Sequence, residues 1–149
     1  MSKLRIGISG KIYPRPQFER IVKQKMSHSK RQRVMLAYRL AKYGHRPEER
    51  LDHTRYFDHC KGVALIIMLE LRIFLSYAVI VGLLHDIEEN TFLLKWHDIE
   101  HIFGEKIYLA IRDLTKEEGK DYFTNLKFAD WWVIVVKLTD RLHNLRTIV

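Results

Sequence analysis

The sequence has a single cysteine, Cys60, and no recognisable export signal. One cysteine excludes an internal disulfide and is typical of a reducing compartment, so we expect a cytoplasmic protein. The opening residues, MSKLRIGISGKIYP, do not contain the apolar core that a signal peptide requires. The chain also lacks internal repeats, low-complexity tracts and strand-like pairs joined by a hairpin turn. These absences leave a globular chain, and its 149 residues correspond to one domain.

A long apolar run is present, but it does not have the composition of a membrane span. Residues 63–84, VALIIMLELRIFLSYAVIVGLL, are long enough to cross a bilayer. Glu70 and Arg72 lie near the middle of the run, where a bilayer penalises charged side chains. We therefore expect two buried helices that meet near Ser76, and no membrane partner.

Positive charge is concentrated in the first third of the chain. Residues 1–50 contain 14 lysines and arginines against 3 acidic residues, a net charge of +11. Residues 51–149 contain 12 against 15, a net charge of −3. Such a density attracts the phosphates of nucleic acids or nucleotides, although a solvated helix face explains it equally well. No aromatic residue interrupts the basic stretch KQKMSHSKRQR, so we do not favour a nucleic-acid partner.

The spacing of apolar residues predicts helices and no sheet. We divide the chain into a basic arm with a short helix at residues 18–28 (together residues 1–28) and one helical domain (residues 29–149). A loop is expected at residues 116–125, and helices are expected at residues 29–44, 56–75, 77–89, 96–104 and 105–114. The last segment contains WVIVV, which alone is compatible with a buried strand. A helix is favoured there because several later residues share one helical face, namely Val136, Asp140, His143, Asn144 and Thr147.

The abrupt change from apolar to acidic residues in VGLLHDIEENT, residues 81–91, indicates a functional site. An ordinary helix end explains His85 and Asp86, and so does a metal site at the helix terminus. His59 begins another apolar helix, and Asp140 directly follows a hydrophobic run. A buried carboxylate must be paired or bound to a metal, which favours the metal site. Two imidazoles and two carboxylates without a thiolate suit Mn, Fe, Co or Zn.

Other noticeable residues have plainer interpretations. We interpret His143 as a packed or hydrogen-bonded histidine and not as a ligand, and His45 as a surface residue. The Trp131–Trp132 pair is interpreted as part of the core. Cys60 has none of the neighbours that stabilise a thiolate, so we interpret it as a packing residue.

Four segments, in the order YFDHCKGVA, LLHDIEENT, FGEKIYLAIRDLTK and KLTDRLHNLRT, resemble the HD-superfamily hydrolases. More narrowly, they are similar to the hydrolase domain of the Rel/SpoT-type (p)ppGpp enzymes and to the small alarmone hydrolases. The similarity covers residues 45–149, and DRLHNLRT is its most specific motif. It implies an all-α HD-domain bundle that removes the 3′-pyrophosphate from (p)ppGpp, a guanine alarmone, with the help of a metal. Because such relatives continue their last helix beyond this motif, residues 29–149 are expected to be a C-terminally short domain.

The resemblance also implies roles for individual residues. His59, His85, Asp86 and Asp140 stand where the family has its metal ligands, which usually hold Mn²⁺. Glu89 matches the first acidic residue of a Glu-Asp-Thr triplet that helps to activate the water or protonate the leaving group.

Arg50, Asn144 and Thr147 match family positions that contact the nucleotide, but two departures leave alternatives open. Asn90 replaces the Asp of the acidic triplet, and an amide orients a water or phosphate without carrying a proton. Residues 51–55, LDHTR, replace the family's usual Lys-Ser/Asp-Gly-x-Pro at the base pocket. The alternatives are hydrolysis of another nucleotide, such as a dNTP, and a degenerate HD domain that binds nucleotide as a regulator. The sequence does not indicate the oligomeric state.

Overall fold

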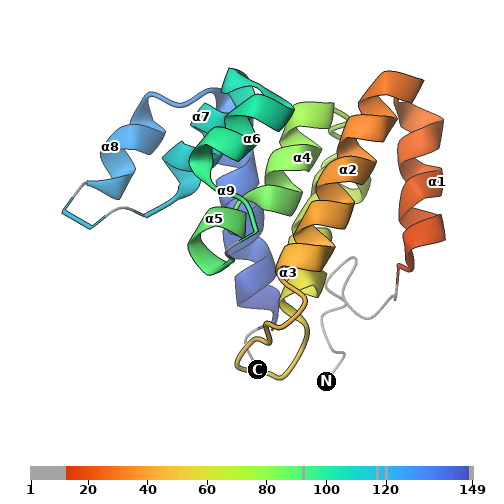
Figure 1. The fold of residues 1–149 in the computed structure, drawn as a ribbon, viewed down its shortest axis with the longest axis horizontal. Coiled ribbons are helices and arrows are strands. Elements are labelled where there is room, and N and C mark those ends of the chain that lie inside the picture. The colour runs from red at the N-terminus through yellow and green to blue at the C-terminus, as the bar shows by residue number, and fades with distance from the viewer. Residues whose placement is uncertain (1–12, 92, 117, 120, 148–149) are drawn as a thin grey trace.

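The computed structural model describes residues 13–91, 93–116, 118–119 and 121–147, and for Asn90 and Tyr122 it describes the backbone alone. Within these ranges every regular element is helical, apart from an isolated β-bridge between Glu49 and Arg55. The all-α prediction is therefore confirmed (Figure 1). The elements in chain order are α1 (Arg15–Lys25), α2 (His28–Gly44), α3 (Tyr56–Leu65), the π-helical η1 (Ile66–Glu70), α4 (Ser76–Leu84), α5 (Ile87–Asn90), α6 (Trp96–Phe103), α7 (Glu105–Leu114), α8 (Tyr122–Lys127) and α9 (Trp131–Thr147).

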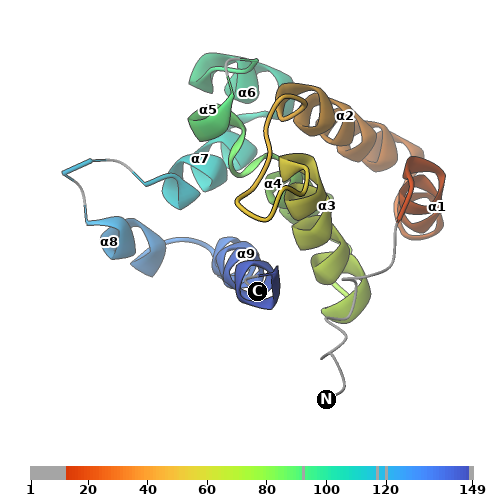
Figure 2. The same cartoon turned by 90° about the horizontal axis from the view of Figure 1, so that it is seen from below.

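Helix α4 forms the centre of the bundle. Its sequence, SYAVIVGLL, is apolar around nearly its whole circumference, and such a helix is stable only when other elements cover every side. Helices α2, α3, α7 and α9 pack against it, and the two ribbon views show α4 enclosed among them (Figures 1 and 2). No helix in the described ranges combines the length and the hydropathy needed to cross a bilayer. Residues that directly follow α4 are therefore enclosed by the neighbouring helices.

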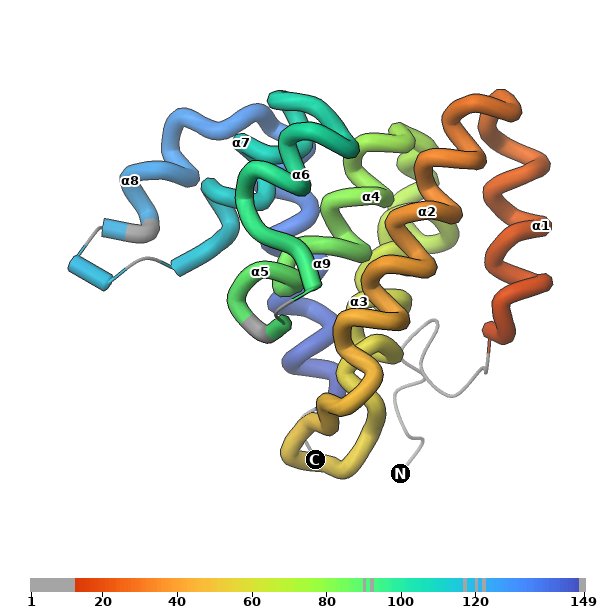
Figure 3. The backbone as a smooth tube through the Cα atoms, in the orientation of Figure 1, coloured from red at the N-terminus to blue at the C-terminus, as the bar shows by residue number. Residues whose placement is uncertain are grey.

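The apolar run of residues 63–84 is interrupted earlier than the sequence predicts. The first helix continues from α3 into the wider turns of η1 and ends at Glu70, not at residue 75. Arg72 has a left-handed backbone with φ of 56°, which ends the helix and turns the chain back toward α4 (Figure 3). Glu70 forms a two-pronged ion pair with Arg146 of α9, at 2.8 Å for the shortest contact. The charge inside the apolar run thus fastens α9 to η1.

The N-terminal third adds one helix to the bundle. Helix α1 begins at Arg15, three residues earlier than predicted, because proline in the first turn has no amide hydrogen to leave unpaired. Its buried residues Phe18 and Val22 belong to the core, and the Phe18 ring lies 4.8 Å from that of Tyr38 on α2. Residues 1–12 of the predicted arm lie outside the described residues, and its separation from the domain stays a prediction.

Two predictions near the last helix are wrong in part. Residues 122–127 form α8 where a loop was expected, because Asp121 caps the helix by accepting hydrogen bonds from Phe123 N and Thr124 Oγ1. Of the tryptophan pair, Trp132 is buried in the core, but Trp131 is 59% exposed. Neighbouring residues on a helix point about 100° apart, so one helix face rarely buries both.

His45 is buried, which corrects its interpretation as a surface residue. It has no exposed surface, and its ring stacks on that of Tyr56 with 4.8 Å between the ring centres. Its Nδ1 lies 3.5 Å from Glu48 Oε2. Burial is the main cause that lowers the pKa of His45 to about 4, so the ring is neutral at pH 7.

This burial makes the stability of the fold depend on pH. Between the usual histidine pKa of about 6.5 and the folded value of about 4, the unfolded chain binds a proton that the folded chain does not bind. Stability is therefore fully present above pH 6.5 and falls as the pH decreases through this window, by about 3 kcal/mol in total. In urea unfolding at pH 7.5 and pH 5, His45→Phe should lose clearly less stability than the wild type. Equal losses in the two proteins would show that His45 is not buried in the neutral form.

Candidate functional site

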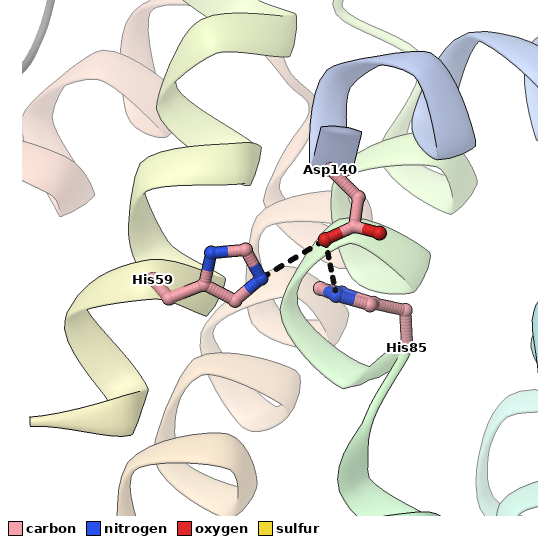
Figure 4. A group of neighbouring side chains, drawn as sticks. All are labelled: His59, His85 and Asp140. Carbon is pink, nitrogen blue, oxygen red and sulfur yellow. Dashed lines mark ion pairs between the residues drawn. The ribbon is translucent and has the colours of Figure 1, made fainter. Parts of the chain in front are cut away.

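Three polar side chains from three segments meet beside the end of α4. His59 lies in the first turn of α3, His85 directly follows α4, and Asp140 lies in the middle of α9. Asp140 Oδ1 is 3.1 Å from His59 Nε2 and 3.5 Å from His85 Nε2 (Figure 4). One potential ligand atom of each residue lies within 4.8 Å of the others, and all three residues are buried. The spacing suits a single metal ion held between them.

Asp86 joins this group from the residue next to His85. Its Oδ2 lies 2.9 Å from His85 Nε2 and 3.9 Å from His59 Nε2. Adjacent residues on a regular helix point away from each other, but the chain leaves the helix here. His85 has helical angles, whereas Asp86 has φ of −108° and ψ of 5°. This change at the helix end turns both side chains toward the same point, and all four predicted ligands are therefore brought together.

The two carboxylates are strongly acidic in this setting. Burial acts to raise their pKa, but the hydrogen bonds and charge of the neighbouring histidines outweigh it and hold the pKa of Asp86 and of Asp140 well below the usual range. Burial in turn acts to lower the pKa of His85, and the two carboxylates raise it well above its usual value. The two carboxylates therefore favour a positive charge between them, which a divalent cation supplies.

The orientation of the His85 ring supports the same conclusion. Its Nδ1 lies 2.8 Å from the carbonyl oxygen of Gly82, which only accepts hydrogen bonds, so Nδ1 carries the hydrogen. Its buried Nε2 forms no hydrogen bond of acceptable geometry with any described residue, although two carboxylate oxygens lie nearby. Histidines that bind a metal usually donate the hydrogen of the other ring nitrogen to a carbonyl or carboxylate, which fixes the tautomer. Nδ1 of His85 has such a partner, and its Nε2 is free to bind a metal.

His143 supports His59 in a comparable way. The Nδ1 atoms of the two rings are 2.9 Å apart, which confirms that His143 is a hydrogen-bonded histidine. Burial is the main cause that lowers the pKa of His143 to about 3, and the nearby His59 and Arg50 lower it further. A neutral His143 accepts a hydrogen from Nδ1 of His59 whenever Nε2 of His59 donates its lone pair to a metal. Gly62 leaves room for this ring, because a Cβ there would overlap it.

Further contacts hold the two carboxylates in place. The Tyr56 hydroxyl donates to Asp86 Oδ2 at 2.6 Å, and Lys137 Nζ donates to Asp140 Oδ2 at 3.2 Å. The sequence analysis missed both residues as parts of the site. Lys137 lies three residues before Asp140 on one helix, so helical spacing was a usable signal, whereas Tyr56 reaches Asp86 only through the tertiary fold.

The three residues that match nucleotide-contacting positions lie next to this centre and touch each other. Arg50 Nη2 donates to Asn144 Oδ1 at 2.7 Å, and Arg50 Nη1 donates to Thr147 Oγ1 at 2.9 Å. Asn144 Nδ2 donates in turn to Asp140 Oδ1 at 3.1 Å. A continuous set of hydrogen bonds therefore runs from a buried carboxylate to a part-buried guanidinium. Whether these residues bind a nucleotide stays a prediction.

The two residues of the acidic triplet lie at the edge of the site. Glu89 is exposed on α5 and its Oε1 accepts a hydrogen bond from the backbone amide of Lys116 at 3.0 Å. Loss of hydration is the main cause that raises the pKa of Glu89, and the charge of Asp86 adds to it. The side chain of Asn90 lies outside the described part of the structure. The catalytic roles expected of both residues stay predictions.

Comparisons with known proteins place the chain among relatives. A family described as "HD domain" matches residues 37–127. The chain is 34% identical over 126 residues to the GTP pyrophosphokinase rsh of Brucella melitensis, a match that covers 75% of this chain and 16% of that protein. It is 30% identical over 130 residues to the bifunctional (p)ppGpp synthase/hydrolase SpoT of Escherichia coli K12, covering 78% of this chain and 18% of SpoT. The chain therefore spans less than a fifth of the length of these relatives.

A solved structure supports the likeness in three dimensions. It is described as "A metazoan ortholog of SpoT hydrolyzes ppGpp and plays a role in starvation responses". It superposes on this chain with a TM-score of 0.66 and 25% sequence identity, over 76% of this chain and 68% of the other. The fold of this chain is thus similar to that of the solved structure.

Proposed function

Since this chain belongs to the HD-domain family, we propose that it is a metal-dependent phosphohydrolase that releases the 3′-pyrophosphate of (p)ppGpp. The observation that carries the proposal is the meeting of His59, His85 and Asp140 at one buried point, with the part-buried Asp86 beside the two imidazoles. The names of the relatives support the substrate. One from Escherichia coli O157:H7, 30% identical over 130 residues, is a guanosine-3′,5′-bis(diphosphate) 3′-pyrophosphohydrolase, and the solved structure is described as hydrolysing ppGpp.

The four proposed ligands suit a divalent metal with borderline preferences. Two imidazole nitrogens and two carboxylate oxygens without a thiolate fit Mn²⁺, which we favour, and also Zn²⁺, Fe²⁺ or Co²⁺. Such an ion supplies Lewis acidity, which lowers the pKa of water and neutralises charge that develops on the phosphate oxygens. The chain's own contribution is to hold the ligands, through His143 and Gly82 behind the imidazoles and Tyr56 and Lys137 behind the carboxylates.

The remaining residues position the substrate and move protons in this proposal. The planar guanidinium of Arg50 offers paired donors to a pyrophosphate group once it exchanges its contacts with Asn144 and Thr147. Glu89 has a raised pKa, so its carboxyl group is closer to the range in which it donates or accepts a proton near neutral pH. Asn90 then orients the attacking water or a phosphate oxygen by hydrogen bonds.

A second candidate is a nucleotide-binding regulator without turnover, and Asn90 is the observation that favours it. The exposed loop of residues 51–55 also does not indicate which nucleotide base the site recognises. Its Leu51 side chain is fully exposed, and His53 takes a left-handed backbone with φ of 63°. Hydrolysis of a different nucleotide is therefore the third possibility that a substrate panel must include.

The hydrolase proposal is tested with ppGpp, Mn²⁺ and an assay for released pyrophosphate. We expect release that stops with EDTA and resumes when Mn²⁺ is restored. Asp140→Ala should weaken Mn²⁺ binding by more than about 100-fold and remove activity, because it deletes a ligand and leaves two imidazoles without their carboxylate. Glu100→Ala, which removes an exposed carboxylate on α6, is the matched control and should leave both unchanged. Unchanged Mn²⁺ affinity in Asp140→Ala would disprove the ligand assignment.

The role of His143 is tested by two substitutions, one that removes its ring and one that displaces it. His143→Ala should weaken Mn²⁺ binding by about 10–100-fold, because Nδ1 of His59 loses its partner. Gly62→Ala should weaken binding as well, since the new methyl group displaces the His143 ring. The two effects should not add in the double variant, because the ring that the methyl displaces is already absent. Full additivity, measured by calorimetry with circular dichroism as the check of folding, would mean that Gly62 acts independently of His143.

The amide at position 90 limits the rate in this proposal. Asn90→Asp restores a group that transfers protons, and general acid–base catalysis contributes about 10²–10⁴-fold. We expect kcat for ppGpp to rise by about 100-fold at unchanged Mn²⁺ affinity. Asn90→Ala serves as the matched control and should not exceed the wild-type rate. A wild type that binds ppGpp without turnover, together with an active Asn90→Asp, would favour the regulator.

A further inference from the structure

A cavity lies between the end of α2 and the start of α3. It has a volume of about 390 Å³. Four cationic side chains line it, from Arg39, Lys42, Arg46 and Arg55. Its remaining walls are aromatic and include Tyr43, Phe57 and the ring of His45. We propose that this cavity binds a nucleoside monophosphate, with the base against the aromatic walls and the phosphate on the arginines, independently of the metal site.

The charge in this cavity is largely unneutralised. Arg39 and Lys42 are exposed one turn apart on α2, and Arg46 follows shortly after the helix ends. Among the described residues none of these three side chains has an ion pair or hydrogen bond, whereas Arg55 is paired with Asp58 at 3.1 Å. Unpaired guanidinium groups are well suited to phosphate, because their planar fork binds two of its oxygens at once.

His45 belongs to the aromatic wall of the cavity. Its ring is fully buried at the wall of the cavity, and neither ring nitrogen forms a hydrogen bond with a described residue. Because both nitrogens are buried, the ring contributes apolar surface to the wall and not a polar contact. Glu48, the carboxylate nearest to the ring at 3.5 Å, does not line the cavity.

The volume and the lining of the cavity suit a small ligand. A volume of about 390 Å³ lies in the range of small-molecule sites, about 300–1,000 Å³, and apolar walls with a few polar groups are typical of them. A neighbouring cavity between α1 and α2 shares Arg39 and is also basic. Part of its positive charge is already engaged within the protein. Arg33 donates a hydrogen bond to the carbonyl oxygen of Phe103, and the acidic residue Glu19 belongs to the lining. A long polyanion along α2 is therefore less well matched than a compact phosphate ligand.

The cavity is separate from the proposed metal centre, but Tyr56 connects the two. The Tyr56 ring stacks on His45 on one side, and its hydroxyl donates to Asp86 on the other. Arg50, which belongs to the proposed substrate site, does not line the cavity. Substitutions can therefore distinguish ligand binding in the cavity from binding at the metal centre.

The proposal is tested by calorimetric titration of the metal-free protein with GMP, AMP and inorganic phosphate. We expect both nucleotides to bind more tightly than phosphate alone. Arg39→Gln and Arg46→Gln should each weaken nucleotide binding by about tenfold, because each removes a charged hydrogen bond. Arg20→Gln, at an exposed arginine on α1 that lines neither cavity, is the matched control and should have no effect. Asp140→Ala and Arg50→Gln should bind as the wild type does.

Amide NMR locates the bound nucleotide. Shifts should concentrate at residues 42–46 and 55–57 and spare residues 140–147. Three results would overturn the proposal: binding that Arg50→Gln abolishes, binding that Arg39→Gln and Arg46→Gln leave unchanged, or binding of a single-stranded RNA oligomer with no binding of mononucleotides. The last result would identify the basic surface as a nucleic-acid interface. None of these outcomes depends on whether ppGpp is hydrolysed, so the two proposals fail separately.

Discussion

One buried and one part-buried carboxylate that face two buried imidazoles are the constraint on which the rest of this structure depends. Asp86 lies between α4 and α5 and Asp140 lies on α9, and a carboxylate withdrawn from water in this way is costly without a positive charge beside it. The pairing with His59 and His85 therefore ties α3, α4 and α9 to one point. This point lies at the C-terminal end of α4, where His85 and Asp86 directly follow the helix.

Hydrogen bonds connect this centre to the surface in two directions. One path leads from Asp140 through Asn144 to Arg50 and Thr147, the residues that match nucleotide positions in relatives. The other leads from Asp86 through the Tyr56 hydroxyl, whose ring stacks on His45 at the wall of the basic cavity. Both paths fix side chains that would otherwise rotate freely, which is how a donor set keeps its geometry before any ion or substrate arrives.

Much of the fold could be predicted from the sequence, because long apolar patterns determine helices. The bounds of α2, α6 and α7 lie within a residue of the expected ones. The errors fall where local signals are weak or where tertiary contacts override them. The helix before α4 ends at Glu70 through a left-handed Arg72 and an ion pair to α9, and α8 depends on one capping aspartate. Neither feature leaves a periodic pattern in the sequence.

The sequence by itself determined which residues form the candidate centre, since His59, His85, Asp86 and Asp140 stand in motifs that resemble a known family and meet in the structure. Only the tertiary structure decided what surrounds them. His143 and Tyr56 contact proposed ligands that lie 84 and 30 residues away in the chain, and His45 is buried with its ring stacked on Tyr56. A motif records which chemical groups are present, but burial and hydrogen bonding depend on packing between distant segments, which no local pattern contains.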